Sequence, residues 1–376
     1  MKKFSFVIPT YNSKVMLKYS LEALNNQLGY TSSDYEVILV DDGSVDDTWD
    51  YIKGTNRNYD LQYIYLEREP CSSRARARNF GWKSAQGEIV VFVDADIIVK
   101  PTHLSELDRL YTYEKDIVVQ GTRLMLPKGT VIDFDNLFQI YNFNRKKLTL
   151  IDIAYFVYDF LSYNICTVRT PGILFSTCNS AVPRKYLEAT NGFDENYIGW
   201  GIEDMDLGCR LHALKDVKFV VSSRLECLHQ FHKHSANLSE ELKRNRTIFE
   251  NKYPNAAGNL PITSEIDIWN VLWIPDDEYL ERFAGKQTKK KNKIVLEFRN
   301  REKFNQLKED ILQMSDREEL DVEVYDYCED TDLDIWITLL GVRKSTPKYF
   351  PVSRRIGKLL PEERSKFLSS LKEAQY

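Results

Sequence analysis

The start of the chain alternates strand and helix patterns, which restricts it to a fold with a parallel sheet. Apolar runs at residues 4–8 and 35–40 predict buried strands, the first ending at Pro9. Leucines recur on one face of a helix predicted over residues 13–28, with Leu28 as the last of them. Two strands joined by a helix form a βαβ unit with parallel strands. We therefore expect an α/β fold in which helices flank a mostly parallel, Rossmann-like sheet.

A third apolar run, residues 88–93, ends in two carboxylates, Asp94 and Asp96. Carboxylates this close repel each other unless a cation or a sugar hydroxyl lies between them. Mg²⁺ and Mn²⁺ accept such oxygen ligands, and a nucleotide diphosphate can supply further oxygens. A solvated acidic turn is the alternative for an isolated Asp-x-Asp pair.

Polar residues also follow the other two predicted strands, at residues 10–12 and 41–42. In open α/β sheets, ligands bind at the carboxyl ends of the strands. Three polar clusters on one rim of the sheet therefore predict a ligand site, and argue against three unrelated turns.

The composition limits the classes to which the chain can belong. Its 376 residues are consistent with one large α/β domain and a smaller one, and its formal charge of −5 argues against a nucleic-acid binder. No apolar stretch reaches the length of a membrane span, and the initial Met-Lys-Lys leads directly into a strand without a signal region. The six cysteines form no CxxC pair, so we expect reduced thiols in a cytoplasmic protein.

Taken in order, residues 7–12, 40–44, 77–79 and 94–96 resemble the signature of family 2 glycosyltransferases, which have the A-type fold. Residues 191–195 and 199–207 resemble a galactosyltransferase-type C-terminal half. That half is shared by chondroitin-polymerase-like enzymes, animal β-1,4-galactosyltransferases and N-acetylgalactosaminyltransferases. The resemblance covers about residues 3–235 and implies an A-type glycosyltransferase fold.

The resemblance implies that the loop after the first strand binds the nucleotide of a UDP-sugar donor, through Pro9, Thr10, Tyr11 and Asn12. Asp41 would accept a hydrogen bond from the uracil N3–H. Thr10 and Asn12 would hold the base or the ribose, although each could instead simply organise its turn.

Arginines alternate over residues 74–78, in a segment that is predicted to be helical. Residues two apart point in different directions around a helix, so these arginines cannot form one clamp. The resemblance implies that Arg78 approaches the nucleotide or pairs with an Asp of the metal site, while Arg74 or Arg76 stays solvated. Ser72 or Ser73 is expected to cap the helix, whose N-terminus can face the phosphates.

The resemblance assigns Asp94 to the ribose or the donor sugar, and Asp96 to a metal ion. A histidine would complete the metal site, and His229 lies at the matching place, after a strand predicted near residues 217–221. His232 is the reserve candidate, and a solvated His-rich turn is the alternative. Because imidazole is a better ligand for Mn²⁺ than for Mg²⁺, we favour Mn²⁺.

Two acids, Glu203 and Asp204, open a predicted helix directly after the Gly-Trp-Gly string that contains Trp200. Acids in a first helical turn are stabilised by the helix dipole, which is the alternative to a catalytic role. The resemblance implies that Asp204 is the base that takes the proton of the acceptor hydroxyl. It also implies that Glu203 binds hydroxyls of the acceptor or the donor sugar. Trp200 would offer an apolar face to a sugar ring, and Asp206 would either support the site or lie on the helix surface.

Three parts are expected along the chain. Residues 1–284 form a catalytic domain, with a nucleotide-binding half at 1–100 and an acceptor and catalytic half at 101–265. Within it, the aromatic residues of 141–164 would form a core helix, a cover for the site or a self-association surface. Residues 285–293 are a basic linker. Residues 294–376 form a small α/β appendage with strands at 294–298, 321–325 and 333–339, a helix at 301–314 and a basic helical tail.

The basic tail would be solvated, or would contact a protein partner or the anionic inner face of a membrane. The sequence thus predicts an inverting, metal-dependent enzyme that moves a hexose or N-acetylhexosamine from a UDP-sugar to an acceptor glycan, glycoprotein or lipid-linked glycan. The galactose type is favoured, by resemblance only. The alternatives are a nucleotidyltransferase, which would need a Gly-rich phosphate loop that residues 9–12 do not provide, and an inactive sugar-binding module.

Overall fold

The computed structural model of the chain describes residues 2–126, 128–135, 171–214, 216–232, 237–253, 292–315 and 320–328, with the four residues 348–351. It also describes a few single positions, which are residues 137, 158, 165, 317, 333, 336 and 337. Together, these ranges and single positions are the described part of the chain. Within them, no helix is long and apolar enough to cross a membrane.

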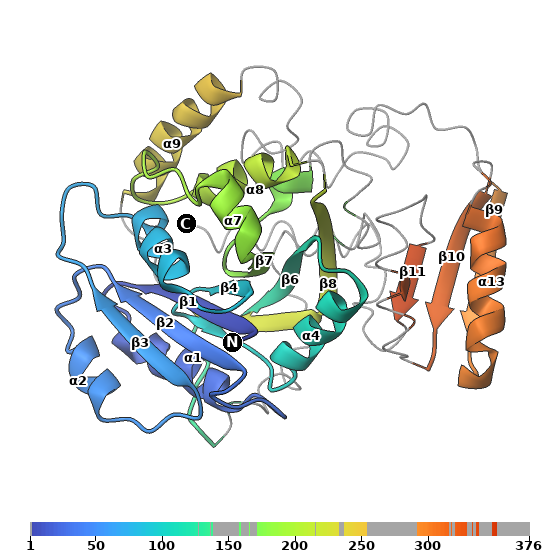
Figure 1. Cartoon of the computed structure of the whole chain (residues 1–376), viewed down its shortest axis with the longest axis horizontal. Coiled ribbons are helices and arrows are strands. Elements are labelled where there is room, and N and C mark those ends of the chain that lie inside the picture. Colours follow the sequence, from blue (N-terminus) through green and yellow to red (C-terminus); the bar gives the residue numbers. More distant parts are fainter. Residues whose placement is uncertain are drawn as a thin grey trace.

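The main body is built on an eight-stranded sheet with the order β3-β2-β1-β4-β7-β6-β8-β5 (Figure 1). β1, β2, β3 and β4 run parallel, whereas β7 runs antiparallel to both of its neighbours. The strands are β1 Phe4–Thr10, β2 Tyr35–Asp41, β3 Asp60–Tyr65, β4 Ile89–Val93, β5 Ile97–Ile98, β6 Ile117–Met125, β7 Asn179–Pro183 and β8 Lys218–His229. The expected α/β fold with a mostly parallel sheet is confirmed.

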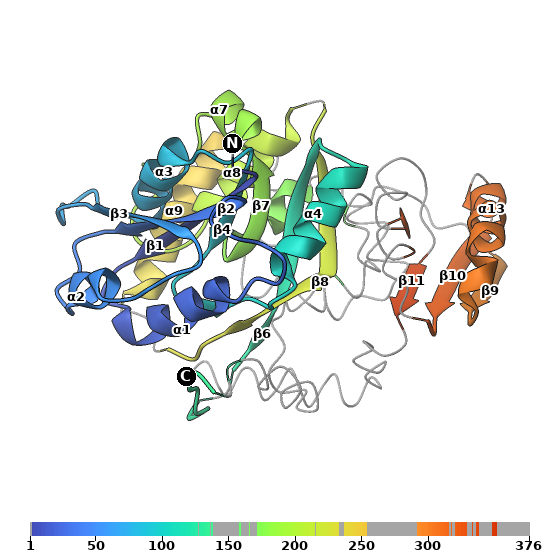
Figure 2. The same cartoon turned by 60° about the horizontal axis from the view of Figure 1, so that its bottom comes forward.

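Helices cover both faces of this sheet, because alternate side chains of its strands point to opposite sides. Phe4, Phe6 and Ile8 of β1 belong to the core beneath α1 and α4, whereas Val7 belongs to the core beneath α3, α7 and α8. Figure 2 shows α1 on one side of the sheet and α3, α7 and α8 on the other. The helices are α1 Lys14–Asn25, α2 Thr48–Lys53, α3 Arg74–Ser84, α4 His103–Tyr113, α7 Arg184–Thr190, α8 Glu203–His212 and α9 Leu238–Lys252, with the 3₁₀ helix η3 Pro171–Leu174.

The predicted βαβ unit is present, but its helix and its first strand end at other residues than predicted. Leu17, Leu21 and Leu24 are buried, but α1 ends at Asn25 and Leu28 is 64% exposed, so the prediction that Leu28 shares the buried face was wrong. β1 does not stop at Pro9 either. It continues to Thr10, which pairs in register with Asp41 of β2.

A separate three-stranded parallel sheet has the order β11-β10-β9 and a core of its own, which includes Phe298, Ile311 and Val324. Its elements are β9 Asn292–Phe298, the 3₁₀ helix η4 Arg301–Lys303, α13 Phe304–Ser315, β10 Leu320–Asp326 and β11 Lys348–Pro351. The strand predicted over 333–339 was wrong, because the described residues there, Leu333, Trp336 and Ile337, are helical. Residues 254–291, most of 138–170 and the tail after 351 lie outside the described residues, so the domain boundaries, the aromatic segment and the basic tail stay predictions.

Candidate active site

The short strand β5 brings two distant parts of the chain together at the carboxyl end of β4. Asp94 and Asp96 lie between β4 and β5, and Ile97 of β5 pairs with His229 at the end of β8. The backbone N–H of Gln230 donates to the Asp96 carbonyl at 2.9 Å. β8 was expected near 217–221, but it runs without interruption to His229, and this length carries the histidine to the acidic turn.

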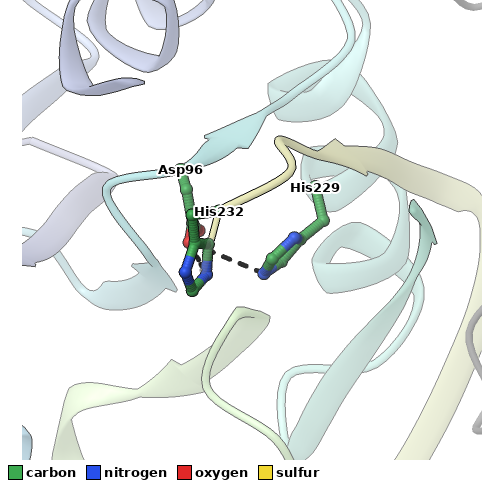
Figure 3. A group of neighbouring side chains, drawn as sticks. All are labelled: Asp96, His229 and His232. Atoms are coloured by element: carbon green, nitrogen blue, oxygen red, sulfur yellow. Dashed lines mark ion pairs between the residues drawn. The ribbon is translucent and has the colours of Figure 1, made fainter. Parts of the chain in front are cut away.

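Asp96, His229 and His232 point toward one another at this place (Figure 3). The Oδ2 atom of Asp96 lies 3.0 Å from Nε2 of His232 and 3.5 Å from Nε2 of His229. One ligating atom from each of the three residues lies within 4.8 Å of the others. The structure therefore brings the predicted pair together and adds the reserve candidate His232 to it.

This cluster has the properties of a site for a divalent cation. Oδ1 of Asp96 and Nδ1 of His229 are buried without a hydrogen-bond partner in the described structure. Burial lowers the pKa of His229, so its imidazole is neutral near pH 7. Burial alone would raise the pKa of Asp96, but the hydrogen bond with His232 and the nearby positive charges lower it below its usual value. A carboxylate and two imidazoles are ligands that fit Mn²⁺.

Arg78 connects the acidic turn to the start of α8. Its side chain is 2% exposed, and its two terminal nitrogens donate to Asp94 Oδ1 and Glu203 Oε1, each at 2.9 Å. Burial alone would lower the pKa of Arg78, but the charges of Asp94 and Glu203 raise it. Burial and the charge of Asp204 raise the pKa of Glu203, against the effect of Arg78. Of the two expected roles of Arg78, the structure shows the pairing with Asp94.

Asp204 is the more accessible of the two acids that open α8. Glu203 is 4% exposed, whereas Asp204 is only half-buried. Oδ2 of Asp204 accepts hydrogen bonds from Thr177, from the backbone N–H at 3.2 Å and from the hydroxyl at 3.3 Å. Thr177, in the segment that leads into β7, thus fixes one oxygen of the Asp204 carboxylate.

Asp206 does not lie on the helix surface, because its side chain is fully buried. It accepts hydrogen bonds from Arg210 at 2.8 Å and from Tyr253 at 3.0 Å, and Lys252 forms an ion pair with it at 2.7 Å. These partners place Asp206 in the contact between α8 and α9.

The two acids after β2 face different surroundings. Asp41 is 1% exposed, and its oxygens accept from the Ser44 N–H at 2.8 Å and from the Tyr63 hydroxyl at 2.7 Å. It borders an open cleft of about 460 Å³ that Trp49 also lines. The contact of Asp41 with uracil stays a prediction.

Asp42 belongs to the polar cluster at residues 41–42, but no role of its own was predicted for it from the sequence. Its oxygens bind the Ser72 hydroxyl at 2.9 Å and the guanidinium of Arg76 at 3.4 Å, and Arg68 donates to it as well. Arg68 in turn stacks 4.0 Å from the ring centre of Tyr11. Adjacent residues at a strand end point to opposite sides, and this alternation could have separated Asp42 from Asp41.

The structure shows how the loop after β1 and the start of α3 are organised. Asn12 has a φ of +49°, and its side chain accepts from the Val45 N–H at 2.9 Å, so it organises the neighbouring loop. Thr10 Oγ1 is buried without a partner in the described structure, and Pro9 lies within the strand. Ser73 caps α3, as expected.

The other arginines of α3 differ in exposure. Arg74 is exposed, whereas the Arg76 side chain is 13% exposed and bound to Asp42. Near the start of α3, a bridge between Ser73 and Gly199 joins this helix to the loop that carries the half-buried Trp200. The helix that was expected to face the phosphates thus adjoins the loop that was expected to face the sugar.

Known proteins match a large part of this chain. Residues 5–165 match the sequence model of glycosyl transferase family 2, and residues 162–233 match that of the N-terminal domain of galactosyltransferase. Validoxylamine A glucosyltransferase of Streptomyces hygroscopicus subsp. limoneus is 27% identical over 268 residues, which cover 68% of this chain and 58% of that protein. Chondroitin synthase of Escherichia coli is 28% identical over 221 residues, which cover 55% of this chain and 32% of that protein.

The chain therefore spans less than two thirds of the length of either relative. Among solved structures, residues 1–349 of S. aureus TarS in complex with UDP superpose with a TM-score of 0.47 and 20% identity, over 74% of this chain and 71% of that one. The topology of the eight-stranded sheet and the family match together confirm the expected A-type glycosyltransferase fold. By these matches, residues 5–165 resemble the family 2 glycosyltransferases, and residues 162–233 resemble a galactosyltransferase-type domain.

Proposed function

We propose that the chain is an inverting glycosyltransferase that moves a sugar from a UDP-sugar to a hydroxyl of an acceptor glycan, with a divalent cation at Asp96, His229 and His232. The observation that carries this proposal is the Arg78 bridge, which joins the turn of the cation cluster to the paired acids of α8. Arg78 thereby fixes Asp94, which would contact the donor, relative to Glu203 at the start of α8.

In the proposed reaction, the acceptor oxygen attacks the anomeric carbon of the donor sugar while the bond to the diphosphate oxygen breaks. Asp204 takes the proton of the acceptor hydroxyl, because it is the accessible acid of the pair and Thr177 fixes its orientation. A cation in the cluster, Mn²⁺ in preference to Mg²⁺, would neutralise charge on the departing UDP.

The remaining residues would bind the two substrates. Oε2 of Glu203 is buried without a partner in the described part of the chain, and Glu203 would bind a sugar hydroxyl once the substrate reaches it. Trp200 would stack on a sugar ring, and Asp94 would contact the donor sugar or ribose. The transferred sugar is a hexose or N-acetylhexosamine, and the match of residues 162–233 favours the galactose type.

The test is a screen of UDP release from a panel of UDP-sugars, with mixed acceptor glycans and with Mn²⁺, Mg²⁺ or chelator. We expect release that depends on both the acceptor and the cation. Glu188→Gln is a matched control, because Glu188 is exposed and pairs only with Arg184 of its own helix among the contacts found here. A protein that binds UDP but never releases it from any UDP-sugar would be an inactive binding module, and would overturn the proposal.

A further inference from the structure

The loop that carries Trp200 is held by one buried side chain of α9. Asn245 is fully buried, and its Nδ2 atom donates to the carbonyl oxygens of Ile198 at 3.1 Å, Trp200 at 3.1 Å and Gly201 at 3.0 Å. The Ile198 carbonyl also accepts from Arg244 of the same helix. α9 spans Leu238–Lys252, beyond residue 233 where the family matches end.

The clamped loop has an unfavourable backbone conformation. Gly199, Gly201 and Ile202 have φ angles of +79°, +89° and +78°. A β-branched residue such as Ile202 rarely adopts a positive φ, and such a residue persists only where its surroundings enforce it. Ile202 is also the residue directly before α8, so its conformation sets the direction in which Glu203 and Asp204 leave the loop.

Other contacts of α9 surround the same loop. A Cβ atom on Gly199 would lie 2.6 Å from the Glu241 carboxyl carbon, so the side chain of Glu241 lies against the loop backbone. Phe249 packs with Tyr197, and Lys252 reaches Asp206 inside α8. α9 therefore contacts the chain on both sides of the Glu203–Asp204 pair.

We propose that Asn245 is a positioning residue for the acceptor side of the site. By holding three carbonyls of the strained loop, it fixes Trp200 and the first turn of α8 where an acceptor sugar would bind. This inference deepens the proposed function and rests on it for its kinetic consequence. The part of the inference that concerns the conformation of the loop is independent of the proposed function.

The first test measures the loop itself. Asn245→Asp keeps the size of the side chain but replaces the donor Nδ2 by an oxygen, which faces the same carbonyls. Arg246→Gln is the matched control, since Arg246 pairs with Glu250 within α9. The chain has six tryptophans, so acrylamide quenching is compared with and without Trp200→Phe in each background. We expect Trp200 to become more accessible in Asn245→Asp and to stay unchanged in Arg246→Gln.

The second test measures transfer. Small displacements of a binding group can cost about 10²-fold in rate. We expect kcat/KM for the acceptor to fall by about this factor in Asn245→Asp, while the Kd for UDP with Mn²⁺ stays that of the parent. If Asn245→Asp does not fold, Asn245→Ala removes the same donor without adding charge and replaces it in both tests.

The two ideas fail in distinguishable ways. Unchanged quenching of Trp200, or a parallel loss of UDP binding and transfer, would overturn the positioning role of Asn245. A parent protein that transfers no sugar would overturn the proposed function, while the quenching result would still decide whether Asn245 holds the loop.

Discussion

Thr177 binds Asp204 with both its backbone N–H and its hydroxyl, and both hydrogen bonds end on the same oxygen, Oδ2. Thr177 is fully buried, whereas Asp204 is only half-buried. One side of the carboxylate is thus fixed by the segment before β7. This arrangement is suited to a group that must meet an acceptor hydroxyl in a constant orientation.

Replacement of Asp204 by Asn should lower turnover far more than donor affinity. The amide keeps the shape of the side chain but cannot accept the acceptor proton, and loss of a general base costs about 10²–10⁴-fold in rate. Steady-state kinetics with both substrates will separate kcat from the two KM values. Near-native turnover would move the base to Glu203 or to another group.

Thr177→Val should lower turnover less than Asp204→Asn does. Valine has a similar shape but removes the hydroxyl, and the backbone N–H still donates to Asp204, so one of two hydrogen bonds is lost. A hydrogen bond to a charged group contributes about 1.5–3 kcal/mol, which corresponds to a change of at most roughly 10- to 100-fold in kcat. Thr177→Ser keeps the hydroxyl and is the matched control. Equal activity of the Val and Ser variants would show that the hydroxyl does not orient the base.

Removal of the cation or of its ligands should abolish the cation-dependent part of UDP binding. The cluster offers one carboxylate and two imidazoles, so Asp96→Ala removes its only acidic ligand, and His232→Ala removes the residue closest to Asp96. Isothermal titration with UDP, with and without Mn²⁺, will measure the effect. Transfer at the full rate after treatment with chelator would show that the cation assignment is wrong.

Local patterns in the sequence were sufficient to predict the βαβ unit and the strand that ends at the acidic turn. They failed where a pattern is short. The apolar run near Leu333 predicts a strand, whereas Leu333 and Ile337 are helical and buried at a spacing of four residues. A short apolar run cannot distinguish a strand from a buried helix by periodicity.

The site depended on contacts between distant segments. Sequence resemblance indicated Asp96 and His229, but only the pairing of β5 with β8 shows that His232 reaches the same carboxylate. Similarly, the sequence left Asp206 either supporting the site or on the helix surface, and only the structure shows Lys252, the last residue of α9, and Tyr253 after it as its partners. Neither relationship follows from spacing along the chain, because each joins elements whose docking the local pattern does not specify.

His103 should make the protein less stable in mild acid. Burial lowers its pKa from 6.5 to about 3, so the folded protein keeps the imidazole neutral, while the unfolded chain takes up a proton below pH 6.5. The stability that this group contributes is therefore complete above pH 6.5 and is lost as the pH falls toward the folded value. At pH 5 the loss should be about 2 kcal/mol.

Urea unfolding of the parent and of His103→Phe between pH 7.5 and 4.5 will measure this effect. Phenylalanine keeps a ring beside Phe6 but does not titrate. The difference in unfolding free energy between the two proteins should change with pH in favour of the variant. Parallel curves would show that His103 is protonated in both states or in neither.

Truncation after Ala284 should leave a protein that binds UDP. Every contact described for the cation cluster, the Arg78 bridge and the Trp200 loop comes from residues before 254. The three-stranded sheet begins at Asn292 and has its own core, so its removal should not open the core of the larger sheet. We expect slow hydrolysis of the UDP-sugar to persist while transfer to the native acceptor becomes poor, because we assign the appendage to acceptor selection, partner binding or self-association. UDP titration and transfer assays on the full and truncated chains will measure both. An insoluble product, or one that no longer binds UDP, would mean that the appendage belongs to the catalytic fold and that the boundary near residue 284 is wrong.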